Sequence, residues 1–158
     1  MFAWFAAEKW LLLFAPFAAK ERQNVEAQRP KLRRKDLLFP KESYEIKSAC
    51  IAVHKALGCG FLEKVYENAL AHEFRKRGFK VQQQAALQVF YDRVLVGDFV
   101  VDLLLDDRFV IEVKAAERDN PLFKAQLINY LKASGVPLGF LVNFGKEHFD
   151  FERVVFTK

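Results

Sequence analysis

The stretch RFVIEVKAAERDNPLFKAQLINYL, residues 108–131, predicts a buried β-strand followed by a helix. Within the apolar run FVIEVK (109–114) stand two charged residues, Glu112 and Lys114. Alternation along a strand places both on the same face. Because Lys and Glu are almost never fully buried unless they are paired or bind a metal, this pair requires a structural or a chemical explanation.

Length and composition indicate one globular domain with an appendage. A chain of 158 residues, 52% of them hydrophobic and 17 of them Phe, can form a substantial core. The only two cysteines, Cys50 and Cys59, form no CxxC and have no His-rich partner segment. This argues against a disulfide framework or a structural zinc site, and favours a reducing, cytoplasmic setting.

The basic character of the chain is confined to its first residues. Residues 1–35 contain eight Lys or Arg and three acidic residues, which accounts for the whole net charge of +5. Residues 36–158 are therefore neutral overall. The sequence pI of about 9.2 is consequently no evidence that the main domain binds nucleic acid.

We predict a domain boundary near residue 35. Residues 1–35 are expected to be a poorly ordered or loosely helical, non-core extension, and an interfacial helix or a signal segment are the alternatives. Glu8, Lys9 and Pro16 interrupt its apolar residues, so no membrane span is expected. The segment could also lie outside the natural protein.

Apolar periodicity and turn residues predict the remaining elements. Helices are expected over 43–57 and 62–77, before Gly78, and from Asn120-Pro121 to Gly135. The expected strands cover 81–91, 94–105, 108–115, 138–143 and 149–156. The order α-α-β-β-β-α-β, with a further strand at the end, predicts an α/β (α+β) fold with helices flanking a mixed sheet.

A second acid interrupts the preceding apolar run. Asp102 lies within FVVDLLLDD (99–107), on the strand expected beside the one that carries Glu112. Two carboxylates on adjacent strands form the kind of oxygen site that Mg²⁺ prefers, and Lys114 could stabilise charge or help to deprotonate an attacking water. The pattern thus suits phosphodiester hydrolysis. The alternative is a buried ion pair of Lys114 with Asp102 or Glu112, although such pairs are often no more stabilising than apolar residues.

The loop between the two strands decides whether the carboxylates meet. A two-residue loop at Asp106-Asp107 would set Asp102 opposite Ile111, on the wrong face from Glu112. A three-residue loop or a bulge would set Asp102 opposite Glu112. We predict the latter register.

Three sequence motifs together resemble a known superfamily. Asp102 followed by Glu112-Val113-Lys114 resembles the D…(D/E)xK signature of the PD-(D/E)xK nucleases, and QLINY is similar to the QxxxY element of their exonuclease branch. GFLEKVY matches the motif that names the GxxExxY family, a small bacterial group within that superfamily. The resemblance covers roughly residues 36–158.

The resemblance implies a restriction-endonuclease-like αβββαβ core and Mg²⁺- or Mn²⁺-dependent hydrolysis of nucleic acid, with DNA expected rather than RNA. Its metal ligands would be Asp102, Glu112 and Glu63, and Lys114 would be the catalytic lysine. Three further residues would support the site or contact the substrate: Gln126, Tyr130 and Tyr66. The oligomeric state stays open, a homodimer included.

Alternatives remain for these residues. Glu63 could be an acid favoured by the helix dipole, Tyr66 a core residue, and Gln126 with Tyr130 a capping or packing pair. The whole domain could be a non-catalytic nucleic-acid-binding or assembly module that keeps the nuclease fold.

Overall fold

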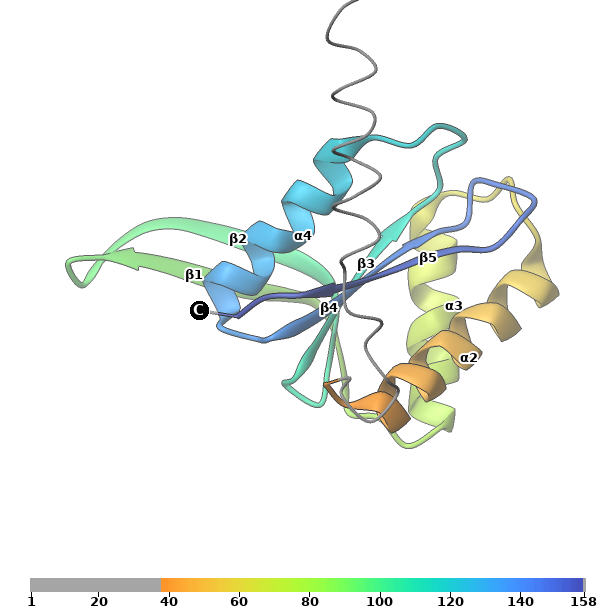
Figure 1. Cartoon of the computed structure of the whole chain (residues 1–158), viewed down its shortest axis with the longest axis horizontal. Helices are drawn as coiled ribbons and strands as arrows, with labels where there is room; N and C mark the ends of the chain where they lie inside the picture. The colour runs from red at the N-terminus through yellow and green to blue at the C-terminus, as the bar shows by residue number, and fades with distance from the viewer. Residues whose placement is uncertain (1–37, 158) are drawn as a thin grey trace, which may run out of the picture. The chain divides into compact units, whose positions relative to one another are not determined.

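The computed structural model describes residues 38–157. The extension predicted over 1–35 lies outside the described residues. The described part contains helices α2 (Pro40–Leu57), α3 (Glu63–Lys76) and α4 (Pro121–Ser134). Its strands are β1 (Val81–Tyr91), β2 (Val94–Leu105), β3 (Phe109–Lys114), β4 (Leu138–Asn143) and β5 (Asp150–Val155). The predicted order of elements is confirmed, including the last strand (Figure 1).

The five strands form one mixed sheet in the order β1-β2-β3-β4-β5. Neighbouring strands are antiparallel except for β3 and β4, which run parallel and are connected through α4. A parallel pair requires such a crossover, whereas the antiparallel pairs need only short loops. The predicted α+β class with a mixed sheet is therefore confirmed.

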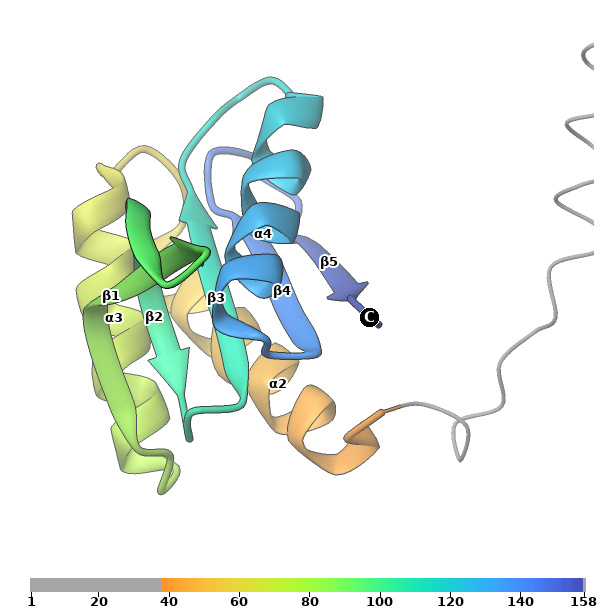
Figure 2. The ribbon, with the colours of Figure 1, turned by 90° about the vertical axis from the view of Figure 1, so that its left-hand side faces the viewer.

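Helices cover both faces of the sheet (Figure 2). On one face, α2 and α3 contribute Ile46, Tyr66 and Phe74 to a core that includes Ile111 and Phe140 of the sheet. On the other face, α4 packs Leu127 and Leu131 against Val110. Both faces of β3 are thus buried, which explains its nearly continuous apolar sequence. Among the helices of the described part, none has the length and apolarity needed to cross a bilayer.

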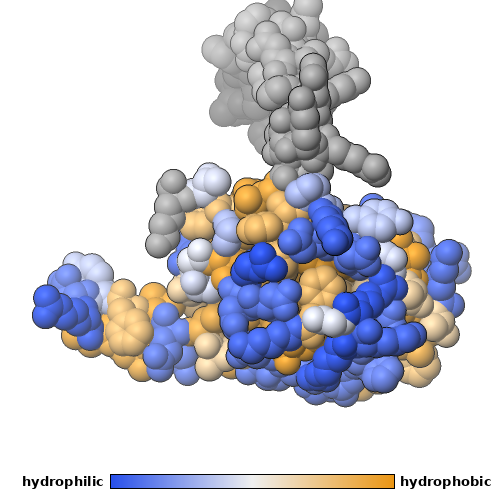
Figure 3. All heavy atoms as spheres, turned by 90° about the horizontal axis from the view of Figure 1, so that it is seen from below, coloured by the Kyte–Doolittle hydropathy of each residue, from blue (hydrophilic) through white to orange (hydrophobic). Residues whose placement is uncertain are grey.

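The β1–β2 hairpin extends beyond this three-layer body (Figure 1). It turns at Asp92-Arg93, both with positive φ (47° and 66°), as two-residue hairpin loops favour. Its outer part exposes apolar side chains, which are visible at the left of Figure 3. They are Phe90, Tyr91, Val94, Leu95, Val96, Phe99 and Val100.

Candidate active site

The register predicted for the β2–β3 hairpin is confirmed. Its three-residue loop, 106–108, gives the pairs Leu103 with Ile111, Leu104 with Val110 and Leu105 with Phe109. The next step of this register would set Asp102 opposite Glu112. The described pairing of β2 with β3 ends before that step. Beyond it, the Asp102 side chain contacts β3, because its Oδ2 accepts a 2.8 Å hydrogen bond from the Val113 amide.

Glu112 and Lys114 form a buried ion pair on β3. The Lys114 Nζ donates to Glu112 Oε1 over 2.6 Å, with the Glu112 side chain 2% and the Lys114 side chain 11% exposed. The second oxygen, Glu112 Oε2, is buried and has no hydrogen-bond partner within the described residues. A carboxylate oxygen left without a partner in a buried site is costly, so the ion pair alone does not satisfy this group.

Burial and mutual repulsion shape the charges of the cluster. Burial, reinforced by the charges of Asp102 and Glu63, raises the pKa of Glu112 to about 7 despite its bond to Lys114. Burial also raises the pKa of Asp102, against the Val113 hydrogen bond and the Lys114 charge. Burial on its own would lower the pKa of Lys114, but the hydrogen bond and charge of Glu112 raise it overall. Lys114 is therefore a cation, but its charge does not outweigh the effect of burial on the pKa of the two carboxylates.

Glu63 lies at the first position of α3, where a carboxylate is favoured by the helix dipole. Its Oε1 accepts a 3.2 Å hydrogen bond from the amide of Ala115, the residue after Lys114. The charge of Glu63 contributes to the raised pKa of both Asp102 and Glu112. The structure thus places Glu63 at the border of the cluster, attached to the end of β3.

Tyr66 occupies the core rather than the cluster. It is fully buried, stacked on Phe144 with ring centroids 4.4 Å apart. Its hydroxyl donates to the Gly58 carbonyl (2.9 Å) and accepts from the Phe61 amide (3.1 Å). Tyr66 therefore fixes the loop that leads into Glu63, and its position suits support rather than substrate contact.

Gln126 and Tyr130 pair on α4, since the Gln126 Nε2 donates to the Tyr130 hydroxyl over 2.6 Å. Burial raises the pKa of Tyr130, and the charges of Glu112 and Asp102 raise it further. The pair therefore lies within electrostatic reach of the carboxylates. On the same helix, the Phe123 ring centroid is 5.2 Å from Lys114 Nζ, a cation–π contact.

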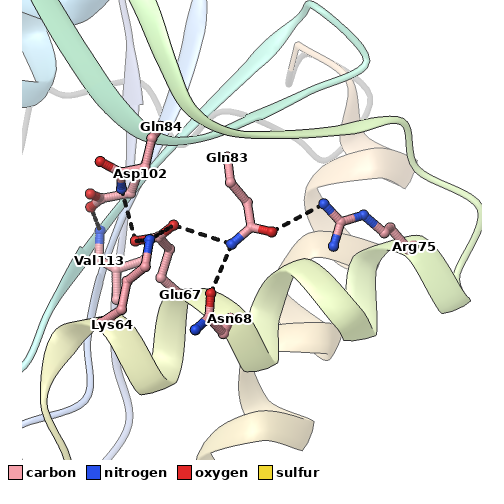
Figure 4. Close-up of polar contacts among 8 residues, drawn as sticks. All are labelled: Lys64, Glu67, Asn68, Arg75, Gln83, Gln84, Asp102 and Val113. Atoms are coloured by element: carbon pink, nitrogen blue, oxygen red, sulfur yellow. Dashed lines mark hydrogen bonds and ion pairs between the residues drawn. The ribbon is translucent and has the colours of Figure 1, made fainter.

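A second polar cluster, not predicted from the sequence, lies beside the first (Figure 4). Its centre is Glu67, one turn after Glu63 on α3 and 4% exposed. Glu67 accepts from Lys64 Nζ (2.8 Å), Gln84 Nε2 (2.8 Å) and Gln83 Nε2 (3.2 Å). The i, i+4 spacing of the two glutamates was the only signal in the sequence, because the glutamines come from a different element.

The donor atoms of the first cluster fit a hard divalent cation. Asp102 and Glu112 supply carboxylate oxygens, and the buried, unpartnered Glu112 Oε2 would gain a partner from such an ion. Within residues 38–157, however, no group of three or more His, Cys, Asp or Glu side chains could hold a metal ion. The structure therefore brings Asp102, Glu112 and Lys114 together, but does not assemble Glu63 with them as a third ligand.

Comparison with known proteins identifies the class. A family model described as the PD-(D/E)XK nuclease superfamily matches residues 40–154, so the chain belongs to this superfamily. The superfamily predicted from the combined sequence motifs is thus confirmed. No curated protein matches the sequence.

Two solved structures resemble the fold. One is the crystal structure of SSO0001, at 17% identity and a TM-score of 0.47, covering 74% of this chain and 60% of that one. The chain thus spans less than two thirds of that protein's length. The other is an alkaline exonuclease (LHK-Exo) from Laribacter hongkongensis, at 12% identity and a TM-score of 0.45, covering 75% of this chain and 70% of that one.

Proposed function

We propose that this protein is a divalent-metal-dependent nuclease that hydrolyses phosphodiester bonds in nucleic acid, DNA rather than RNA. The observation that carries the proposal is the Asp102–Glu112–Lys114 cluster, with its buried and unpartnered Glu112 Oε2. In a member of a nuclease superfamily, an incomplete cluster of two carboxylates and a lysine is better explained by catalysis than by stability.

Asp102 and Glu112 would hold Mg²⁺ or Mn²⁺. Glu63, which accepts from the Ala115 amide at the border of the cluster, would have to move toward the ion to become a third ligand. When bound, the ion would neutralise phosphate charge and lower the pKa of a bound water. Hydrolysis forms a bond from the water oxygen to phosphorus and breaks the bond to the leaving oxygen, which receives a proton.

Lys114 would act through its positive charge. Because its pKa is raised, it remains protonated at neutral pH and is a poor base for deprotonating water. The ammonium group can instead donate hydrogen bonds to a phosphate oxygen as negative charge develops there. Gln126 and Tyr130 would support the site from α4 or contact the substrate backbone, and Tyr66 would hold the loop before Glu63.

The proposal extends to the family within the superfamily, the bounds of the domain and the cellular setting. The GxxExxY family is proposed from Gly60, Glu63 and Tyr66, and a nuclease domain over 36–158 is supported by the family match to 40–154. Free Cys50 and Cys59 support a cytoplasmic setting.

The alternative is a non-catalytic nucleic-acid-binding or assembly module. One observation favours it: Lys114 is bonded to Glu112, as expected of a buried ion pair that serves only the fold. The unpartnered second oxygen of the same glutamate opposes it, since a purely structural pair would leave no such atom.

The test is cleavage of single- and double-stranded DNA and RNA with Mg²⁺, with Mn²⁺ and with EDTA. Asp102→Ala and Lys114→Ala should each reduce cleavage by about 100-fold or more. Matched controls are Asp98→Ala on β2 and Lys132→Ala on α4, both exposed, which should cleave like the wild type. Activity that survives Asp102→Ala and Lys114→Ala would remove the assigned site. Metal-independent binding without cleavage of any substrate would favour the module.

A further inference from the structure

Apart from a bulge near its turn, between Val89 and Phe90, the pairing of β1 with β2 is interrupted opposite Asp102. Before it, Gln83 pairs with Leu103, and after it Ala85 pairs with Val101. The register is the same on both sides, so no residue has been inserted, yet the pair of Gln84 with Asp102 is missing. Since the β2–β3 pairing also ends at Leu103, Asp102 is released from the described pairing on both sides.

The cause on β1 is the backbone of Gln84. Its φ of 51° lies in the left-handed region, which residues with a side chain rarely adopt and strand residues even less. Gln has no special tolerance for this region, unlike Gly or Asn. Something in the surroundings must therefore hold Gln84 there.

The hairpin changes faces at this point. On β2, Leu103 packs in the core beneath α2 and α3, whereas Val101 packs in the core beneath α4. On β1, Val81 packs against the first core and Ala85 against the second. In a regular strand, residues two apart share a face, so both strands rotate by one position where Gln84 and Asp102 lie.

The group that holds Gln84 is the carboxylate of Glu67. Gln83 and Gln84 are adjacent, and in a regular strand their side chains would point to opposite faces. Here both donate to Glu67, through Gln83 Nε2 to Oε1 (3.2 Å) and Gln84 Nε2 to Oε2 (2.8 Å). Gln83 is itself fixed, since it donates to Asn68 (2.9 Å) and accepts from Arg75 (3.1 Å). Figure 4 shows these contacts beside Asp102.

We propose that Glu67, Gln83 and Gln84 form a clamp that positions Asp102, in addition to the residues assigned to the active site. The clamp holds β1 away from Asp102, so that β2 can turn the carboxylate toward the Val113 amide and the neighbouring Glu112. Without the clamp, the β2–β3 pairing would continue in its present register and set Val101 opposite Val113. The two strands would then close the space that the Asp102 carboxylate occupies. The role in cation binding rests on the proposed nuclease function, but the positioning does not.

The test is a series of variants at Gln84. Gly adopts a positive φ freely, Ala less so, and β-branched Val least of all. If the left-handed backbone matters, Mn²⁺ affinity should fall in the order Gln84→Gly, Gln84→Ala, Gln84→Val. Gln84→Gly should remain close to the wild type, and Gln84→Val should bind about tenfold more weakly or worse, as when groups that orient metal ligands are removed. Strand propensity alone predicts the opposite ranking.

Gln88 provides the matched control. It is an exposed glutamine of β1 in a regular pair with Asp98, so Gln88→Gly and Gln88→Val should leave Mn²⁺ affinity unchanged. Glu67→Gln should weaken Mn²⁺ binding in the wild-type background but have little further effect in Gln84→Gly, since glycine adopts the left-handed backbone without the contact to Glu67. Thermal unfolding establishes that each variant is folded.

A second readout needs no metal. Amide hydrogen exchange at Val113 should accelerate in Gln84→Val and remain slow in Gln84→Gly, because the first loses the Asp102 acceptor and the second retains it. Equal exchange and equal Mn²⁺ affinity in all Gln84 variants would overturn the clamp and leave the nuclease proposal intact. A wild type that binds no Mn²⁺, with the predicted exchange pattern, would overturn the nuclease proposal and support the clamp as a positioning device.

Discussion

The Asp102 carboxylate accepts a 2.8 Å hydrogen bond from the backbone amide of Val113, the residue between Glu112 and Lys114. A side chain of β2 thereby replaces a backbone contact to β3 at the point where the strands separate. This bond ties the first acid of the proposed site to the strand that carries the other two residues. The geometry of the site therefore depends on the separation of the strands as well as on the residue types.

Asp102→Asn should stabilise the metal-free protein. The asparagine side-chain oxygen can still accept from Val113, while the repulsion between Asp102 and Glu112 disappears. We expect the free energy of unfolding to rise by about 1 kcal/mol at pH 7.5 in EDTA, the scale of one pKa unit. Urea denaturation measures it, with the exposed Asp98→Asn as control. A clear loss of stability in both Asp102→Asn and Glu112→Gln would instead indicate a structural ion pair.

The metal-free protein should lose stability as the pH rises from 4.5 to 7. The folded state raises the pKa of Glu112 from 4.5 to about 7, so it binds a proton that the unfolded chain releases. Stability from this group is therefore complete below pH 4.5 and is lost as the pH passes 7, by at most roughly 3 kcal/mol. The raised pKa of Asp102 acts in the same direction.

Unfolding of the wild type and Glu112→Gln in EDTA across this pH range measures the effect. The variant should have the shallower dependence, because Gln does not titrate there. Mn²⁺ affinity should show the opposite trend and increase with pH, since a carboxylate must lose its proton to bind a cation. Identical pH dependences of the two proteins would contradict the raised pKa of Glu112.

Tyr130→Phe should affect cleavage more than stability. The substitution keeps the ring and its edge contact with Phe99, and removes only the hydroxyl that accepts from Gln126. We expect the free energy of unfolding to change by about 1 kcal/mol or less, the net value of one hydrogen bond. Cleavage should fall by about tenfold, a loss of about 1.4 kcal/mol in the barrier. Tyr44→Phe, at an exposed tyrosine of α2, is the control; equal activity in both variants would remove Tyr130 from the site.

Gly145→Ala should be more damaging than Gly139→Ala. A Cβ at Gly145 would lie 2.4 Å from backbone atoms of Ala116, whereas one at Gly139 would lie 2.7 Å from the end of the Leu127 side chain. A side-chain end can shift, but the backbone after Lys114 is held by Asn143, whose Oδ1 accepts from the Ala116 amide and whose Nδ2 donates to its carbonyl. We expect Gly145→Ala to lose about 3 kcal/mol and Gly139→Ala about 1–2 kcal/mol in thermal unfolding. The reverse order would contradict this packing.

Much of the fold follows from local sequence patterns. The run 109–114 predicted a buried strand, and Asn120-Pro121 and Gly135 predicted the ends of α4, where Asn120 accepts from the Leu122 amide. The hairpin register could be predicted because the turn residues leave two choices, of which only the three-residue loop or a bulge sets Asp102 opposite Glu112. The helix predicted from residue 43 begins instead at Pro40, since proline is well suited to the first helical turn.

The second polar cluster could not be predicted in this way. The residue type does not predict the left-handed backbone of Gln84, because the contact that holds it comes from Glu67, on a different element. The same holds for the change of faces between Val101 and Leu103, which interrupts an apolar run that is continuous in the sequence.

The sequence by itself therefore determined the order of the elements, the residues that carry charge into the sheet, and the register that brings Asp102 toward Glu112. These depend on alternation, turn residues and loop length, which act over a few neighbouring positions. Only the tertiary structure decided that Asp102 leaves the strand pairing to reach Val113, that Glu112 keeps one oxygen without a partner, and that Glu67 holds Gln84. Those features arise where elements distant in sequence meet and exchange hydrogen bonds in a buried space, a result of packing that local preferences do not encode.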